Sequence, residues 1–320
     1  MNVLITGGAG FIGSNLARYI NKNLPHYSIV IFDKFNDQSK LDNGNYKYLG
    51  DYNNLIGINA EIIIGDITSE IDINRLYEHN FDVIYHLAAI SDTRASNQNE
   101  LFLNNIVPTY SFIKMAKKMD AKLVYASSAA VYGSSKECKY GCESPENAYA
   151  FSKYCMDKMI INLNPEKGPN KGITGLRFFN VYGPGEDYKF KTSSTINQFF
   201  KQAKSNKEIV LFEGSDKIYR DFIFIDDVVE MIYLSSLSLE TKVFNVGTGI
   251  PRTFQDIADE VIKLIGSNIR IKLIKNPYKS GYQYFTKADM EETIKNLNYT
   301  PKYTLEQGIR NYYSCLENLK

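Results

Sequence analysis

The chain has 320 residues, of which 44% are hydrophobic and 23% are charged, and these proportions are typical of a globular protein with a sizeable buried core. The formal net charge of +1 excludes a general electrostatic attraction to nucleic acid or to an anionic membrane, so neither is expected as a partner. The sequence has no apolar run of about 20 residues and no basic, apolar leader, so we expect no membrane span and no secretion signal.

Short β-branched segments alternate with helical patterns through the first half of the chain. The segment 101–120 is one of the helical patterns. Strands that are almost continuously apolar and alternate with helices are typical of a parallel sheet covered on both faces. We therefore predict an α/β fold with a doubly wound parallel sheet of the Rossmann type. Its buried strands are expected at 2–6, 28–33, 60–67, 81–89, 122–128 and 173–179.

The pattern changes after residue 178. A polar loop with Gly and Pro, 183–195, precedes a helix expected near 193–205, and a strand-helix pattern returns at 220–249. The remaining tail is mostly helical. We predict a dinucleotide-binding domain formed by 1–178 and about 221–248. A smaller, discontinuous and mostly helical substrate domain is formed by about 179–220 and 249–320.

The first expected strand leads directly into a glycine-rich loop, VLITGGAGFIG, with Gly7, Gly10 and Gly13. Glycine is required where such a loop turns sharply and where its backbone approaches a pyrophosphate. The N-terminus of the following helix offers N–H groups and a positive dipole end to phosphate. The loop therefore predicts a dinucleotide site.

Asp33 ends the second strand about 20 residues after the last of these glycines, where an acidic side chain accepts a hydrogen bond from a ribose 2′-hydroxyl. This favours NAD. Lys34 follows at once and Lys40 lies in the same loop, and either could hold the 2′-phosphate of NADP. The sequence alone leaves both cofactors open. Asp66 and Ile67, at the end of the third strand, are expected beside the adenine, although a strand-end Asp is an equally good account of Asp66.

A tyrosine and a lysine separated by one helical turn occur four times, at Tyr110/Lys114, Tyr132/Lys136, Tyr149/Lys153 and Tyr154/Lys158. Ser127 and Ser128 end a strand on the sheet edge where ligands bind, and Tyr149/Lys153 lie about 20 residues later on the helix expected to follow. Tyr110/Lys114 follows no strand-end hydroxyl, Tyr132/Lys136 falls in a loop with Gly133, and Tyr154/Lys158 points along a different stripe of the helix. Residues i and i+4 share a helix face, so both side chains can reach the cofactor.

The combination of Ser128, Tyr149 and Lys153 indicates redox chemistry at a hydroxyl group. A free phenol has a pKa near about 10 and is a poor base at neutral pH. The Lys153 ammonium and a cationic nicotinamide should both lower the pKa of Tyr149. We expect Ser128 to hold the substrate hydroxyl and Tyr149 to take its proton, while the nicotinamide receives a hydride.

The four cysteines, at 138, 142, 155 and 315, contain no C-x-x-C pair. Cys138 and Cys142 stand in a polar loop without a nearby histidine. We therefore predict no metal site, and reduced thiols in a cytoplasmic protein.

The glycine loop, the strand-end serine and the Tyr-x-x-x-Lys pair resemble the extended short-chain dehydrogenases/reductases, the NAD-dependent epimerase/dehydratase family, over the whole chain. The family mostly acts on nucleotide-linked sugars. Its dehydratases carry an Asp-Glu pair after the strand-end hydroxyl, where this chain has Ala129 and Ala130, so dehydration is disfavoured.

The second half is similar to one branch of the family, the ADP-glyceromanno-heptose 6-epimerases, in RFFNVYGPGEDYKFKTSST, LFEGSDKIYRDFIFIDDV, FNVGTG and GYQYFTKAD. The resemblance implies transient oxidation at C6 of the heptose with NADP or NAD, in the synthesis of lipopolysaccharide inner-core precursors. It places a second acid/base on Lys189, with Lys191 as a rival. It also implies a ring-like homo-oligomer, such as a pentamer.

The resemblance carries over further site residues. Those expected at the cofactor are Phe11, Ile12, Asp33, Lys34, Lys40, Leu87, Ala88, Ala89, Ser91 and Asn104. Those expected at the nucleotide sugar are Asn180, Val181, Gln198, Phe212, Glu213, Gly214, Ser215, Arg220 and Tyr282. Arg220 has a planar fork suited to phosphate oxygens, although an interdomain salt bridge would account for it as well.

Three positions depart from the branch. Gly185 replaces an arginine, Leu87 replaces a polar residue and Gln198 replaces a histidine. An epimerase or reductase of another nucleotide sugar, such as a GDP-linked heptose, is therefore an alternative. A non-catalytic cofactor-sensing protein is the third alternative. Such proteins usually lack the serine, the tyrosine or the lysine of the catalytic set, and this chain keeps all three.

Overall fold

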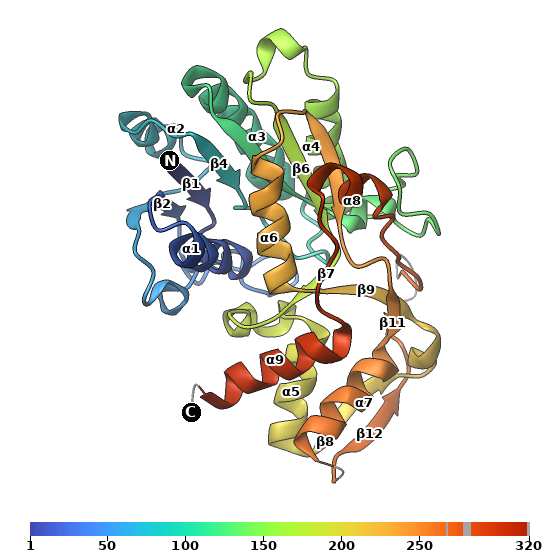
Figure 1. The fold of residues 1–320 in the computed structure, drawn as a ribbon. Coiled ribbons are helices and arrows are strands. Elements are labelled where there is room, and N and C mark those ends of the chain that lie inside the picture. The colour runs from blue at the N-terminus through green and yellow to red at the C-terminus, as the bar shows by residue number, and fades with distance from the viewer. Residues whose placement is uncertain (267, 278–282, 319–320) are drawn as a thin grey trace.

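Seven parallel strands form the central sheet, in the order β10-β6-β5-β4-β1-β2-β3 (Figure 1). The computed structural model describes residues 1–266, 268–277 and 283–318. The predicted doubly wound parallel sheet is confirmed. The strands are β1 (Asn2–Thr6), β2 (Ser28–Asp33), β3 (Glu61–Ile64), β4 (Val83–His86), β5 (Lys122–Ser128), β6 (Ile173–Phe178) and β10 (Lys242–Val246).

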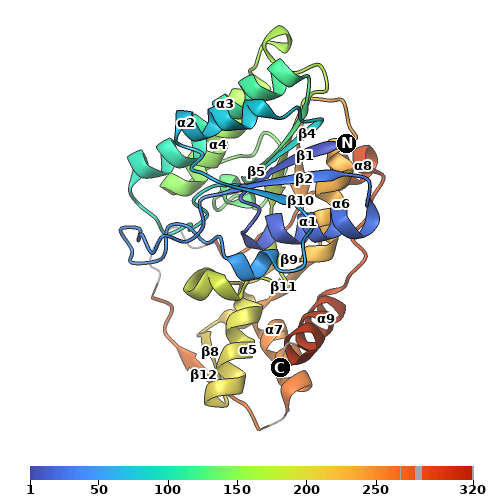
Figure 2. The ribbon, with the colours of Figure 1, turned by 90° about the vertical axis from the view of Figure 1, so that its left-hand side faces the viewer.

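Helices cover both faces of this sheet (Figure 2). Successive strand residues point to opposite faces, so Leu4 packs with the residues of one helical layer while Val3 and Ile5 pack with those of the other. One layer contains α2 (Glu70–Arg75), α3 (Gln98–Met119) and α4 (Ala148–Ile161). The other contains α1 (Phe11–Asn23), α6 (Ile225–Ser236) and α8 (Glu291–Leu297).

The prediction that the third strand is buried is wrong. Ile62 is 49% exposed and Ile64 is 65% exposed, and only Ile63 is buried. The reason is topological, because β3 lies at the edge of the sheet beyond β2. Its apolar sequence resembles that of a central strand, but the strand has a neighbour on one side only.

The second half of the chain adds a smaller lobe below the sheet in Figure 1. The sequence did not reveal the short strands β11 and β12, which pair with segments far away along the chain. The strands here are β7 (Asn180–Tyr182), β8 (Glu208–Phe212), β9 (Tyr219–Phe224), β11 (Pro251–Thr253) and β12 (Arg270–Ile274), arranged as β11-β9-β7 and β12-β8. The helices are α5 (Thr195–Asn206), α7 (Phe254–Ile265) and α9 (Leu305–Asn318).

Short 3-10 helices complete the described elements. They are η1 (Tyr52–Leu55), η2 (Leu76–Glu78), η3 (Ala129–Tyr132), η4 (Pro165–Lys167), η5 (Asp187–Thr192) and η6 (Ser215–Lys217). The division into two domains at the expected boundaries stays a prediction. Although α8 belongs to the tail that was expected in the substrate domain, it packs on β10 and α6 at the large sheet.

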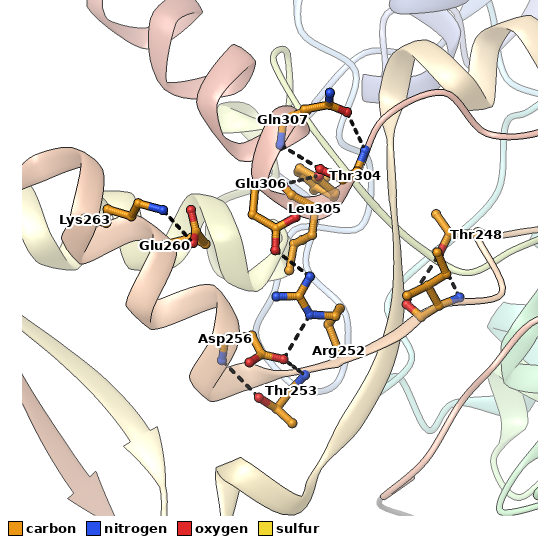
Figure 3. A network of polar contacts seen from close by, with 12 residues as sticks. Thr248, Arg252, Thr253, Asp256, Glu260, Lys263, Thr304, Leu305, Glu306 and Gln307 are labelled. Atoms are coloured by element: carbon orange, nitrogen blue, oxygen red, sulfur yellow. Dashed lines mark hydrogen bonds and ion pairs between the residues drawn. The ribbon is translucent and has the colours of Figure 1, made fainter.

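Arg252 ties two helices of the smaller lobe together (Figure 3). Its Nε lies 3.1 Å from a carboxylate oxygen of Asp256 on α7, and its Nη1 lies 2.6 Å from one of Glu306 on α9. Thr253 and Asp256 form a reciprocal capping box at the start of α7. The start of α7 and the start of α9 are thereby held against each other.

Candidate active site

The glycine loop joins β1 to α1 at the carboxyl edge of the sheet. Gly7 has φ +70°, and a Cβ there would lie 2.8 Å from the backbone N and Cα of Ala88. A Cβ on Gly13 would lie 2.3 Å from the carbonyl oxygen of Gly7. Only glycine fits both places. The loop therefore packs tightly and leaves the N-terminus of α1 open as a phosphate cradle, so the residues fit a dinucleotide.

Asp33 anchors this loop from the end of β2. One oxygen of its carboxylate accepts from the backbone N–H of Ala9 at 2.9 Å, and the other accepts from that of Phe35 at 2.8 Å. Burial raises the pKa of Asp33, and these hydrogen bonds oppose the rise because they stabilise the carboxylate. Each oxygen keeps a further lone pair that a ribose hydroxyl could use.

Lys34 lies beside Asp33 in an acidic and aromatic setting. Its Nζ is 2.9 Å from a carboxylate oxygen of Asp66 and 3.5 Å from one of Asp37, and it lies 4.2 Å from the centre of the Tyr48 ring. Burial opposes the charged form of Lys34, but the bond to Asp66 and its other partners outweigh burial and raise its pKa. Lys34 is therefore cationic and already paired.

A cavity of about 430 Å³ runs along the carboxyl edge from the glycine loop to the end of β5 and the start of β7. Its lining includes every residue expected at the cofactor except Lys40. These are Gly7, Gly10, Phe11, Ile12, Gly13, Asp33, Lys34, Asp66, Ile67, Leu87, Ala88, Ala89, Ser91, Asn104, Tyr149 and Lys153. Ser128, Asn180, Val181 and Lys189 line the same cavity, so the structure brings together all four expected catalytic side chains.

Ser128, Tyr149 and Lys153 meet where β5 ends and α4 begins. Ser128 caps η3 by accepting from the backbone N–H of Ala130 at 3.1 Å, and its hydroxyl lowers the pKa of the nearby Tyr149 phenol. Asn147 caps α4, which places Tyr149 in its first turn. The Lys153 Nζ donates to the carbonyl oxygen of Ala126 at 2.8 Å and lies 6.0 Å from the centre of the Tyr149 ring.

The pKa of Tyr149 is shifted in the direction opposite to the expected one. Burial raises it, because the phenolate loses hydration, and the nearby Ser128 hydroxyl opposes this rise only in part. The Lys153 ammonium is directed to the Ala126 carbonyl. Burial also lowers the pKa of Lys153 to about 8, with Asp157 opposing that shift. In the protein itself, desolvation therefore outweighs the charge of Lys153.

Lys189 and Lys191 leave the same loop in different directions. Lys189 is half-buried, and its Nζ lies 5.3 Å from the centre of the Phe11 ring at the main cavity. Lys191 is exposed and lines a second cavity of about 710 Å³. Phe190 between them has φ +50° and ψ −120°, which interrupts the helical turn and separates the two lysines.

The second cavity shares Lys189 and Thr192 with the first. Lys40 also lines it, with its Nζ 5.7 Å from the centre of the Tyr46 ring, and is absent from the lining of the main cavity. Gln198 lies there too and donates to the carbonyl oxygen of Ser193 at 2.8 Å. The structure therefore separates Lys40 from the other expected cofactor residues and places it near Lys191 and Gln198.

The residues expected around the nucleotide diphosphate lie between the last residue of β8 and the start of β9. Phe212, Glu213, Gly214 and Ser215 form a turn in which Gly214 has φ +79°. Arg220 is 7% exposed, donates to the carbonyl oxygens of Tyr219 and Gln283, and stacks over Phe254. None of these five residues is among the described lining of either cavity. Tyr282 lies outside the described residues.

The comparisons with known proteins agree with this geometry. The sequence profile of the NAD dependent epimerase/dehydratase family matches residues 3–247. The chain belongs to this family. An ADP-L-glycero-D-manno-heptose-6-epimerase of Brachyspira hyodysenteriae is 34% identical over an alignment of 322 positions that covers 98% of this chain and 98% of the relative.

Solved structures of family members superpose on the whole chain. The ADP-L-glycero-D-manno-heptose-6-epimerase of Helicobacter pylori is 37% identical with a TM-score of 0.89, over 99% of this chain and 96% of that one. A UDP-glucose 4-epimerase of Thermotoga maritima is 24% identical with a TM-score of 0.85 over the full length of both chains, and shares the fold. The expected family is confirmed, and with it the expectation of a nicotinamide dinucleotide as cofactor.

Other residues of this epimerase/dehydratase site were not found from the sequence. Tyr48 lines the main cavity beside Lys34, and Phe222 and the segment 192–195 line it together with Asn180 and Lys189. Glu186, which the loop pattern did not single out, is fully buried behind Lys189. The sequence offered one signal for Glu186: it is an acidic residue that follows Gly183 and Gly185 and precedes Lys189.

The described part of the chain contains no group of three or more His, Cys, Asp or Glu side chains placed to hold a metal ion. Among the described residues, none of the helices is both long enough and apolar enough to cross a membrane.

Proposed function

We propose that the protein is an isomerase that inverts C6 of ADP-glycero-manno-heptose by transient oxidation, and so supplies the heptose precursor of a lipopolysaccharide inner core. The two relatives that bear this activity in their names support the proposal, because each aligns with nearly the whole chain at 34% and 37% identity. A cytoplasmic location and a homo-oligomeric state belong to the same proposal.

The observation that carries the proposal is the convergence of two proton-handling groups on one cavity. Tyr149 comes from α4 and Lys189 comes from the loop after β7, and both line the main cavity. An epimerisation that passes through a ketone requires proton transfer to and from the oxygen in two half-reactions. A one-way reductase would need only one such group.

Each residue has a defined role in this scheme. A nicotinamide held in this cavity would supply the hydride acceptor for C6 and then the hydride donor for the other face of the ketone. Ser128 holds the C6 hydroxyl, and Tyr149, on the wall of the same cavity, takes the proton of that hydroxyl. Lys153, held by the Ala126 carbonyl, supplies a nearby positive charge. The proton returns to oxygen from Tyr149 or Lys189 as hydride arrives.

We assign the second acid/base to Lys189 rather than Lys191. Lys189 lies on the wall of the main cavity, and burial lowers its pKa below the ordinary value, which brings it closer to the working pH. Lys191 is exposed and faces the second cavity, where a role in substrate binding fits better. Gln198 would share that role.

We propose NADP as the cofactor, with Lys34 as the ligand of its 2′-phosphate. The position of Lys34 on the cavity wall and its lasting positive charge support this. NAD is the alternative, favoured by the carboxylates of Asp33 and Asp66 on the same wall. The mass of the cofactor released by denaturing the purified protein distinguishes them, and Lys34→Met should weaken NADP binding more than NAD binding.

A second candidate substrate is another nucleotide-linked sugar, such as a GDP-linked heptose. Gly185 favours it, because a glycine stands where the heptose epimerases carry an arginine, and its φ of +94° suits glycine rather than a long side chain. The loop beside the sugar therefore lacks one cation. This affects which nucleotide sugar binds more than which reaction occurs.

The deciding experiment incubates the purified protein with ADP-D-glycero-D-manno-heptose and follows C6 by NMR. The proposal expects the second epimer to accumulate to an equilibrium mixture without added cofactor, because a bound nicotinamide is regenerated in each turnover. The GDP-linked heptose is tested in parallel. Stoichiometric consumption of free NADPH would identify a reductase, and inertness toward both sugars would refute the proposal.

A further inference from the structure

A buried carboxylate closes the loop that carries Lys189. Glu186 has no solvent exposure. One carboxylate oxygen accepts from the backbone N–H of Gly183 at 3.3 Å and from the Ser194 hydroxyl at 2.6 Å. The other accepts from the backbone N–H of Ser194 at 2.5 Å. The two ends of the 183–194 loop therefore meet on one side chain.

Lys189 lies inside this closed loop. Its backbone N–H donates to the carbonyl oxygen of Glu186 at 3.0 Å, and its own carbonyl accepts from the Thr192 hydroxyl at 2.7 Å. The backbone is thus held on both sides of Lys189. The side chain starts from a fixed point and reaches the cavity beside the Phe11 ring.

The chemistry of the surrounding groups requires a carboxylate here. The two N–H groups and one hydroxyl that point at Glu186 are all donors, so a glutamine amide would direct its own N–H atoms at one of them. Burial raises the pKa of the Tyr312 phenol on α9, and the charge of Glu186 raises it further. Of the loop's other charged groups, Asp187 pairs with Lys201 at 3.0 Å and Lys191 faces solvent.

The charges of Glu186 and Lys189 stabilise each other. Burial raises the pKa of Glu186, and Lys189 is the strongest influence against that rise. Burial lowers the pKa of Lys189, and Glu186 opposes the fall. Each group therefore helps the other to stay ionised in a position that water reaches poorly.

We infer that Glu186 is the positioning residue of Lys189: its carboxylate closes the loop that aims the amino group into the cavity and places a negative charge within that loop. This inference rests on the proposed function for the catalytic role of Lys189. Glu186 itself acts through Lys189 and does not touch the substrate in this scheme.

The test measures Lys189 directly. Trace labelling of the full-length protein with acetic anhydride modifies only unprotonated amines, so the labelling of Lys189 against pH, read by mass spectrometry, gives its titration midpoint. We expect Glu186→Gln to move this midpoint to lower pH by about one unit, because a negative charge in the same loop is lost. Asp187→Asn is the matched control, since it removes the neighbouring carboxylate that pairs with Lys201, and should leave the midpoint unchanged.

Turnover is measured on the same variants. We expect Glu186→Gln to keep its cofactor and to lose at least about tenfold in kcat. The part of the pH profile of kcat that reports the titration of Lys189 should move to lower pH, in the same direction as the labelling midpoint. Asp187→Asn should stay within about twofold of the unmodified protein. An unmoved midpoint in Glu186→Gln, or an equal shift in both variants, overturns the inference.

Two further measurements keep the test decisive. Should Glu186→Gln fail to fold, Glu186→Asp retains the charge but shortens its reach, so we expect an unchanged midpoint and a reduced kcat; a midpoint about one unit lower would overturn the inference. Labelling needs no substrate. A shifted midpoint in a protein that proves unable to epimerise would therefore refute the proposed function and leave the positioning role in place.

Discussion

Arg177 is the residue whose loss should destabilise this fold most clearly. It stands on β6 with 2% of its side chain exposed, between carboxylates of Asp157 at 2.8 Å and Glu143 at 2.7 Å, whose side chains are 1% and 4% exposed. It also donates to the Tyr132 hydroxyl at 2.8 Å. Arg177→Met keeps much of the volume but leaves two buried carboxylates without their cation.

The expected cost follows from that burial. Removing one partner of a buried ion pair typically costs about 3–5 kcal/mol, because an uncompensated charge remains inside the protein. The free energy of unfolding of a typical domain is about 5–15 kcal/mol, so the variant should unfold at a much lower urea concentration. Arg75→Met is the control, since Arg75 is half-exposed and lies 3.9 Å from Asp72, and should cost under about 1 kcal/mol.

The pH dependence has a defined sign. Burial raises the pKa of both carboxyl groups, while Arg177 opposes this and holds the pKa of Glu143 below its ordinary value. Without Arg177 both folded-state pKa values exceed those of the unfolded chain. The loss in free energy of unfolding caused by Arg177→Met is then present above the unfolded pKa values. It shrinks as pH falls toward those values, because protonation neutralises the buried carboxylates.

Urea unfolding followed by circular dichroism at about pH 7.5 and about pH 5 measures this difference. We expect a smaller deficit for Arg177→Met at the lower pH. A cost below about 1 kcal/mol at neutral pH, or a deficit that grows on acidification, would refute the reasoning.

Three further predictions concern the site. Tyr149→Phe should retain cofactor but lose about 10²–10⁴ in kcat, measured by the NMR assay, and full activity would exclude Tyr149 as the acid/base. Lys189→Met should lower kcat by a similar factor, whereas Lys191→Met should mainly raise KM; a reversed pattern in steady-state kinetics would move the acid/base to Lys191. Gly7→Ala should be purified without cofactor, as read by ultraviolet absorbance and mass, because its Cβ would lie 2.8 Å from the Ala88 backbone at φ +70°, and normal cofactor content would contradict the cradle.

Much of the fold could be predicted because its signals are local. The strand segments, the glycine spacing and the i, i+4 relation of Tyr149 and Lys153 are fixed by backbone periodicity and by the absence of a Cβ. The location of the ligand site at one edge of the sheet could then be predicted from the strand positions, because parallel strands end together where ligands bind. The family, the central sheet and a set of residues that converges on one cavity were therefore accessible from the sequence.

Tertiary structure alone decided what depends on contacts between distant segments. The exposure of Ile62 and Ile64 follows from the place of β3 at the sheet edge. The upward shift of the Tyr149 pKa follows from burial, which no local pattern reports. Lys189 and Lys191 are two residues apart in sequence, yet a backbone interruption at Phe190 and the buried carboxylate of Glu186 direct one to the cofactor cavity and the other to solvent.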